Sequence, residues 1–347
     1  METEQQKKRI LIGDIVYQNT CEVEFKGKKP KRSWMKDWSL EDRVEKFFEF
    51  CQVFDDRQDS LLNQEYQIFS HRLHWHEHPF CNYMQAITNN EQRLFLTLVF
   101  SFTNEHWQTF MHLYEGGIES ARERFVNHRH ARNDLFQIYY PKGTNVKEWI
   151  LEGPRQAAKD LKYLFDEIEA PRDFRDKRRP YTMMEFAKKL EAYFKEHQNF
   201  RSPLYPCKNT ARYIAMSYPH LVDPESILFG GTGHFDGLHQ IFDGDNLNGK
   251  VKYEIDDRGQ FVPLNKKASL WLDQMKYLVE HPSNPMVAQK YLNVEDKTCF
   301  FWKHIAISHG EKRPTKNIPY TWIFPSTFSL ANHNSFLSGI EQRQLMY

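Results

Sequence analysis

The chain has no excess charge of either sign, few cysteines and no long apolar run. Its 347 residues include 47 lysines and arginines against 46 aspartates and glutamates, so a uniformly basic nucleic-acid coat is excluded and any DNA contact must come from local patches. The five cysteines are scattered and form no C-x-x-C pair, which indicates reduced thiols in a cytosolic setting. Because no apolar run approaches membrane-spanning length, we expect a soluble protein with no membrane partner.

Familiar cofactor and metal patterns are missing as well. No Gly-Lys-Ser/Thr follows the glycine-rich segment at 230–237, and that segment lacks the spacing of a dinucleotide site. The run HRLHWHEH at 71–78 places histidines at helical spacing, so two metal ligands are feasible, but the H-E-x-x-H order and cysteine partners are absent. We therefore expect no cofactor and no resident metal, with an assisting divalent ion left open.

The periodicity predicts a mainly α protein with minor β-hairpins. Aromatic residues make up 15% of the chain, which indicates a large aromatic core, a stacking surface for bases, or both. Ser39 to Asp42 forms a capping-box-like helix start, and Thr182 is a second N-cap. Helices are predicted at 41–54, 60–78, 90–115, 117–129, 154–168, 183–197, 207–217 and 265–280, and hairpins at 9–25 and 250–264.

A charged linker bounded by prolines at 171–180 is a plausible subdomain boundary. We expect an N-terminal basic and β extension at 1–40 and a helical subdomain at 41–170. A third segment at 171–245 would hold a helix pair and a glycine-rich site. A hairpin with a helical C-terminal segment at 246–347 would pack on this core.

The helix pair is joined by a proline-bounded turn, PLYPC at 203–207, with KNTAR directly after it. This order resembles the helix-hairpin-helix core of DNA base-excision glycosylases, in which hairpin N–H groups hold a DNA phosphate. The glycines usual in that hairpin are missing. Asn209 stands where bifunctional members have a lysine nucleophile, which disfavours a Schiff-base lyase mechanism. An ordinary helix pair is the alternative.

Two stretches after the hairpin offer catalytic candidates. Asp223 lies near the place of the glycosylase aspartate, although Asp-Pro-Glu-Ser is also a common helix N-cap. In GGTGHFDG at 230–237 the glycines would let the backbone approach a phosphate, while His234 and Asp236 could shuttle a proton. A structural glycine turn is the alternative.

Three motifs together resemble a group of bacteriophage DNA-modifying proteins: FSFTN at 100–104, PCKNTAR at 206–212 and GTGHFDGLHQ at 231–240. These are the α-glutamyl/putrescinyl-thymine pyrophosphorylases, or amino acid:DNA transferases, related to the helical domain of hydroxymethyluracil DNA kinases. The resemblance covers about residues 40–245. It implies a glycosylase-like helical bundle acting on duplex phage DNA in the cytoplasm of an infected bacterial cell.

In that pathway a kinase pyrophosphorylates 5-hydroxymethyluracil in DNA, and the transferase lets an amino acid or a polyamine displace pyrophosphate. Because this chain has no P-loop, the resemblance implies the transferase. Such an enzyme needs positioning, neutralisation of the leaving group, and removal of a proton from the amine.

Each requirement has candidate residues. The proton acceptor would be Asp236, His234 or Asp223. The pyrophosphate ligands would be Lys208, Arg212, Arg129 and Arg132. Base-stacking candidates are Tyr213, Phe235 and Trp107. DNA contacts would come from Lys28, Lys29, Lys31, Arg32, Arg178 and Arg179, although such basic sets are also typical of a solvated face.

Two other functions fit the same residues. A monofunctional glycosylase would use Asp223 or Asp236 to activate water or stabilise a cationic sugar. A non-enzymatic DNA- or protein-binding factor would use the basic patches alone, with a structural glycine turn.

Overall fold

The structure is a computed structural model of the chain, and it describes residues 10–12, 15–17, 35–56, 79–103, 107–127, 138–171 and 178–308. Over these residues the fold is mainly helical with small two-stranded sheets, which confirms the predicted fold class. The finer helix-hairpin-helix arrangement stays a prediction. The chain forms two compact units, and the division falls after Pro224.

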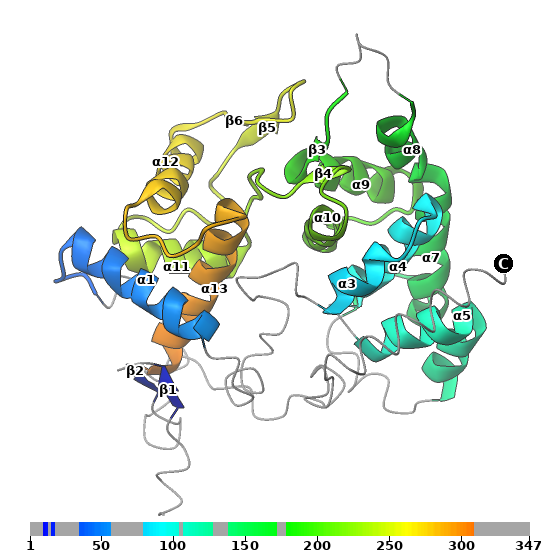
Figure 1. Ribbon diagram of the computed structural model, residues 1–347, viewed down its shortest axis with the longest axis horizontal. Coiled ribbons are helices and arrows are strands. Elements are labelled where there is room, and N and C mark those ends of the chain that lie inside the picture. Colours follow the sequence, from blue (N-terminus) through cyan, green and yellow to red (C-terminus); the bar gives the residue numbers. More distant parts are fainter. Residues whose placement is uncertain are drawn as a thin grey trace, which may run out of the picture. The chain divides into compact units, whose positions relative to one another are not determined.

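Unit 1 comprises the described residues up to 56 and from 225 onward. Its elements are β1 (Ile10–Ile12), β2 (Ile15–Tyr17), α1 (Leu40–Asp56), α11 (Thr232–Phe242), β5 (Tyr253–Ile255), β6 (Phe261–Pro263), α12 (Lys266–Glu280) and α13 (Lys290–Ser308). In Figure 1, α11 in yellow-green lies beside α13 in orange, and these two helices form the centre of the unit.

The start of α1 and both hairpins agree with the sequence prediction. Ser39 Oγ accepts a hydrogen bond from the backbone N–H of Asp42 at 3.1 Å, which satisfies an N–H group of the first turn. One face of α1 is buried, with Phe47 and Phe50 in ring contact with Phe301 of α13. Strands β1 and β2 pair antiparallel, as do β5 and β6.

Two helices of unit 1 were not predicted. The glycine-rich segment forms α11 rather than a turn, and α13 follows the last predicted helix, 265–280, within the C-terminal segment. The contact between α11 and α13 explains two glycines of α11. A Cβ at Gly237 would clash with the backbone carbonyl of Thr298, and a Cβ at Gly233 would clash with the sulfur of Cys299. Glycine therefore lets the two helices approach closely.

Unit 2 comprises the described residues from 79 to Pro224. Its elements are α3 (Pro79–Gln85), α4 (Asn90–Phe102), α5 (Trp107–Asn127), α7 (Val146–Leu161), α8 (Tyr163–Glu169), β3 (Tyr181–Thr182), α9 (Met183–His197), α10 (Leu204–Ser217) and β4 (Val222–Asp223). Its core is aromatic: Phe80 stacks on Phe100 at 4.0 Å, and the ring of Tyr213 meets both at 5.1 Å.

Helix α9 has the predicted bounds and N-cap. Thr182 Oγ1 accepts from the backbone N–H of Glu185, whose carboxylate accepts from the N–H of Thr182, so the two residues form a capping box. The loop after α9 is tied to α7, since Gln198 accepts from the indole N–H of Trp149 at 2.8 Å and donates to the carbonyl of Gly153 at 2.8 Å. These bonds fix the connection between α9 and α10.

Other boundaries differ from the prediction. Helix α10 begins at Leu204, because Pro206 fits the first turn, where an N–H group has no helical partner. Helix α7 runs through Pro154 instead of beginning there. Asp223 is no N-cap, since it lies in β4, which pairs in parallel with β3.

The division after Pro224 also cuts the expected segment 171–245, separating the helix pair from the glycine-rich helix. None of the helices in the described ranges is long and apolar enough to cross a membrane.

Replacing Gly237 with alanine should destabilise the contact between α11 and α13. The added methyl group meets backbone that cannot rotate away, so we expect a loss of about 1–3 kcal/mol in the free energy of unfolding, measured by urea denaturation. Gly244→Ala is the control, because a Cβ there meets nothing within 4 Å. Equal stability of the two variants would contradict close packing.

Glu169 should make unit 2 sensitive to acid. Burial by itself raises the pKa of this carboxyl, but hydrogen bonds from His220, Asn90 and Arg93 outweigh burial and lower it to about 2. The ionised form therefore stabilises the fold above the ordinary pKa of 4.5, and this contribution disappears as the pH falls toward 2.

Urea denaturation of wild type and Glu169→Gln across this range measures the effect. We expect a stability difference that is constant above about pH 5 and shrinks at lower pH. A stability difference that does not depend on pH would contradict the stabilising role of the hydrogen bonds to ionised Glu169.

Candidate functional site

His234 is held in the core of unit 1 by both ring nitrogens. Nε2 accepts a hydrogen bond from the indole N–H of Trp271 at 2.8 Å. Nδ1 lies 2.7 Å from the hydroxyl of Thr298, and that hydroxyl donates to the carbonyl of Glu295 at 2.8 Å. The hydroxyl must therefore accept from Nδ1–H, which fixes the neutral tautomer with the proton on Nδ1. His234 is 1% exposed, which favours a structural role, and proton transfer by this residue stays a prediction.

The start of α11 is not arranged as a phosphate site. The backbone N–H of Gly231 donates to the carboxylate of Glu295 at 3.4 Å, so a carboxylate already lies beside the end of the helix that would attract an anion. A Cβ at Gly230 would clash with the ring of His234. These contacts favour the structural interpretation of the glycine-rich segment.

Asp236 is the remaining acid/base candidate of this segment. It is buried, and its Oδ1 accepts from the amide of Asn246 at 2.7 Å. The backbone N–H of Asn248 donates to Oδ1 of Asn246 and so fixes the direction of that amide. Asp236 is therefore a positioned carboxylate, and its role in proton transfer stays a prediction.

In unit 2, four residues of α10 that can bind a polar ligand lie along one face. Tyr205, Lys208, Asn209 and Arg212 occupy positions i, i+3, i+4 and i+7, which share a side of an α-helix. We call these four residues the α10 stripe. Their exposure falls from 45% at Tyr205 to 6%, 2% and 5% at the next three, so the stripe leads from the surface into the protein.

Two other sides of α10 are occupied by packing. Tyr213 belongs to the aromatic cluster with α3 and α4. Cys207 is fully buried near Glu191 of α9, and burial is the main cause that raises the pKa of its thiol well above the usual value, so it is no thiolate nucleophile at neutral pH. The inner part of the stripe, Lys208, Asn209 and Arg212, is buried as well.

The amide of Asn209 is among the unsatisfied groups of α10. Its Nδ2 is buried and has no hydrogen-bond partner in the described parts of the chain. A buried N–H donor without a partner costs about 1–3 kcal/mol, and native proteins retain few such groups.

Tyr205, at the outer end of the stripe, is in ring contact with a second tyrosine. The rings of Tyr139 and Tyr205 lie 5.4 Å apart, and Tyr140 is 41% exposed. The backbone N–H of Tyr139 donates to the carbonyl of Phe102 at 2.9 Å, which anchors this segment to the end of α4. The sequence prediction missed Tyr139 and Tyr205, although Tyr205 has the spacing of the stripe once α10 begins at Leu204.

The other predicted residues have different settings. Tyr213 and Phe235 are core residues, because their rings pack against neighbouring aromatics and are 0% and 2% exposed, which leaves no face for a base. Asp223 is half-buried at the end of β4 in unit 2, the unit that contains the stripe.

Arg178 and Arg179 hold local structure. Arg178 donates to the carbonyl of Glu167 in the last turn of α8 and to that of Ala170 directly after the helix, and Arg179 forms an ion pair with Glu185 at 2.8 Å. A further role of these two arginines in DNA binding stays a prediction.

Several predicted site residues lie outside the described residues. They are Lys28, Lys29, Lys31, Arg32, Arg129, Arg132 and the histidines of 71–78, and the side chain of Trp107 is also outside the described part.

No group of three or more potential metal ligands occurs in the part of the chain that the structure describes.

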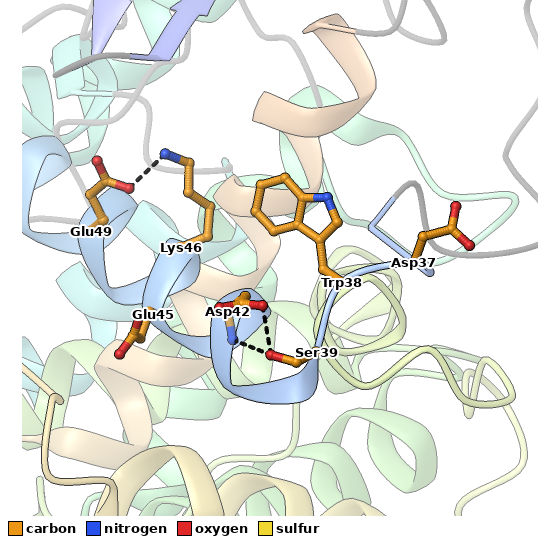
Figure 2. Close-up of a pocket in the computed structure, with 7 residues that line it drawn as sticks. All are labelled: Asp37, Trp38, Ser39, Asp42, Glu45, Lys46 and Glu49. Atoms are coloured by element: carbon orange, nitrogen blue, oxygen red, sulfur yellow. Dashed lines mark hydrogen bonds and ion pairs between the residues drawn. The ribbon is translucent and has the colours of Figure 1, made fainter.

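A surface hollow in unit 1 follows the start of α1 (Figure 2). It is acidic, Trp38 is among its lining residues, and Lys46 is paired with Glu49 at 2.6 Å. Its lining residues are Asp37, Trp38, Ser39, Asp42, Glu45, Lys46 and Glu49. Because carboxylates repel phosphates, this surface is unsuited to DNA.

Comparisons of the chain with protein-family models, curated proteins and solved structures give no match, so the candidate site rests on its own geometry.

Replacing Thr298 with valine should destabilise unit 1, because Nδ1–H of His234 would lose its acceptor inside the core. The expected loss is about 1–3 kcal/mol in the free energy of unfolding by chemical denaturation. Thr298→Ser keeps the hydroxyl and should be less destabilised. If serine and valine behaved alike, the hydrogen bonds would not hold His234.

Proposed function

We propose that the protein transfers an amine, either an amino acid or a polyamine, onto pyrophosphorylated 5-hydroxymethyluracil in DNA and releases pyrophosphate. The observation that supports this function is the α10 stripe, which has two buried cations within one turn of each other. The stripe lies in the KNTAR segment that resembles the phage transferases.

The reaction makes limited demands on the protein. The amine nitrogen attacks the methylene carbon on C5 of the base, a C–N bond forms, and the C–O bond to pyrophosphate breaks with its electron pair on the leaving oxygen. A base removes one proton from the nitrogen. The main contribution of the protein is therefore to position the reactants and to neutralise the leaving group.

Lys208 and Arg212 suit that neutralisation. Arginine can bind phosphate oxygens through two parallel N–H groups, and lysine supplies a compact positive charge. Because both are about 95% buried, their attraction for an anion is screened less by water than that of a surface residue. A pyrophosphate reaching these side chains would be held strongly.

The proton acceptor is one of two carboxylates. Asp223 lies in the same unit as the stripe and follows α10 in the chain. Asp236 lies in unit 1 and is positioned by Asn246. Asp223→Asn and Asp236→Asn, each checked for retained fold, distinguish the two.

Lys208→Gln and Arg212→Gln should each slow amine transfer by about 100-fold, since removing one preorganised donor to a developing negative charge costs 10²–10³ in rate. DNA containing pyrophosphorylated 5-hydroxymethyluracil is incubated with the protein and an amine mixture, and the digested nucleosides are analysed by mass spectrometry. Lys159→Gln on the exposed side of α7 is the matched control and should be unaffected.

The products also distinguish the other functions. A new amine adduct supports the transferase. A free base and an abasic strand would indicate a monofunctional glycosylase, and an unchanged substrate that is still bound would indicate a DNA-binding factor. Either of these two results would overturn the proposed function.

A further inference from the structure

The loop that follows α11 ends in a tight turn at Asn248 and Gly249. The backbone N–H of Lys250 donates to the carbonyl of Leu247 at 2.9 Å, which closes a β-turn. Gly249 is the third residue of this turn and has a φ of 71°, the left-handed conformation that a type II turn requires at that position. Asn248, Gly249 and Lys250 are exposed, so the turn is open to water.

This turn places a nucleophile next to an electrophile. The electrophile is Cγ of the Asn248 side chain, the nucleophile is the backbone nitrogen of Gly249, and a bond between them closes a five-membered ring. A side chain on the residue after an asparagine hinders this attack, and glycine has none. The surroundings also leave space, because a Cβ at Gly249 would meet nothing within 4 Å beyond its chain neighbours. The sequence contains Asn-Gly at this position alone.

The hydrogen bonds of the turn leave both reacting groups accessible. In the described part of the chain, the N–H of Gly249 donates no hydrogen bond. Nδ2 of Asn248 donates to the hydroxyl of Thr232 at 3.4 Å, which is longer than the usual range for N–H···O hydrogen bonds. Because an exposed turn with few buried contacts opens at little cost in free energy, the reacting atoms can approach each other without unfolding of unit 1.

We propose that Asn248 is a site of spontaneous deamidation in the folded protein. The nitrogen of Gly249 loses its proton and attacks Cγ of Asn248, a C–N bond forms, and the Cγ–Nδ2 bond breaks with release of ammonia. Water then opens the cyclic imide. Attack of water at Cγ gives aspartate, and attack at the backbone carbonyl carbon gives isoaspartate, in which the main chain runs through Cβ and Cγ. The net reaction consumes water and releases ammonia, and nothing is oxidised or reduced.

The modification would change the surroundings of Asp236. The backbone N–H of Asn248 donates to Oδ1 of Asn246 at 2.9 Å, and the amide of Asn246 donates to Oδ1 of Asp236 at 2.7 Å. Isoaspartate lengthens the main chain by a carbon atom and adds a negative charge, so the hydrogen bond that closes the turn between Leu247 and Lys250 loses its geometry. Asn246 then loses the contact that fixes its direction, and the hold on Asp236 weakens.

The test follows the folded protein over time. Wild type is incubated in mildly alkaline and in mildly acidic buffer, circular dichroism checks that it stays folded, and peptide mapping by mass spectrometry locates aspartate and isoaspartate. We expect both products at Asn248, formed faster in alkaline buffer because the attack needs the deprotonated nitrogen. Asn265 is the internal control and should stay unmodified, because its Nδ2 donates to the carbonyl of Lys250 at 2.9 Å and a lysine follows it. No conversion of Asn248 in the folded protein would overturn the proposal.

Asn248→Gln separates the ring closure from general hydrolysis. Glutamine keeps the amide, but its longer side chain would have to close a six-membered ring, so this variant should lose the modification at 248. If Asn248→Gln released its amide as fast as wild type, the nitrogen of Gly249 would not be the nucleophile.

Urea denaturation measures the effect of the product on unit 1. After chromatographic separation, the isoaspartate form should have a lower urea midpoint than Asn248→Asp, which carries the same charge on an ordinary main chain. Equal midpoints of these two proteins would overturn the expected weakening around Asp236. None of these measurements involves DNA or an amine donor, so their outcome is independent of the proposed function.

Discussion

The burial of α10 is the constraint on which unit 2 depends. From Pro206 to Ser217 every residue of this helix is buried, so each side needs neighbours of matching chemistry. One side meets the aromatic cluster of α3 and α4, and another lies near Glu191 of α9. Lys208 and Arg212 lie one helical turn apart on another side, where burial would strengthen their attraction for the anion that we propose as a ligand.

Close packing governs unit 1 in a different way. The glycines that look like a ligand cradle in the sequence let α11 approach α13, and the histidine among them is hydrogen-bonded to Trp271 and Thr298. The polar residues of this segment therefore stabilise a helix pair. Asp236, held by Asn246, is the one predicted acid of the segment that these contacts leave as a candidate for chemistry.

Local signals in the sequence predict local structure well. The cap at Thr182, the start of α1 and the hairpin at β5 and β6 each depend on residues a few positions apart. Helix α13 was missed because its middle is polar yet buried all round, which removes the amphipathic pattern. The role of His234 depends on partners 37 and 64 residues away, and no local pattern contains them. Lys208 and Arg212 were named as candidate pyrophosphate ligands because of their residue type. Tyr205 could be placed on the stripe only after the structure showed that α10 begins at Leu204.

Calorimetric titration of inorganic pyrophosphate tests most directly whether the α10 stripe is an anion site. The account predicts that wild type binds pyrophosphate, that Arg212→Gln loses most of the affinity, and that Lys159→Gln binds as wild type does. Equal binding by the Arg212 variant and wild type, or no binding by wild type, would contradict it.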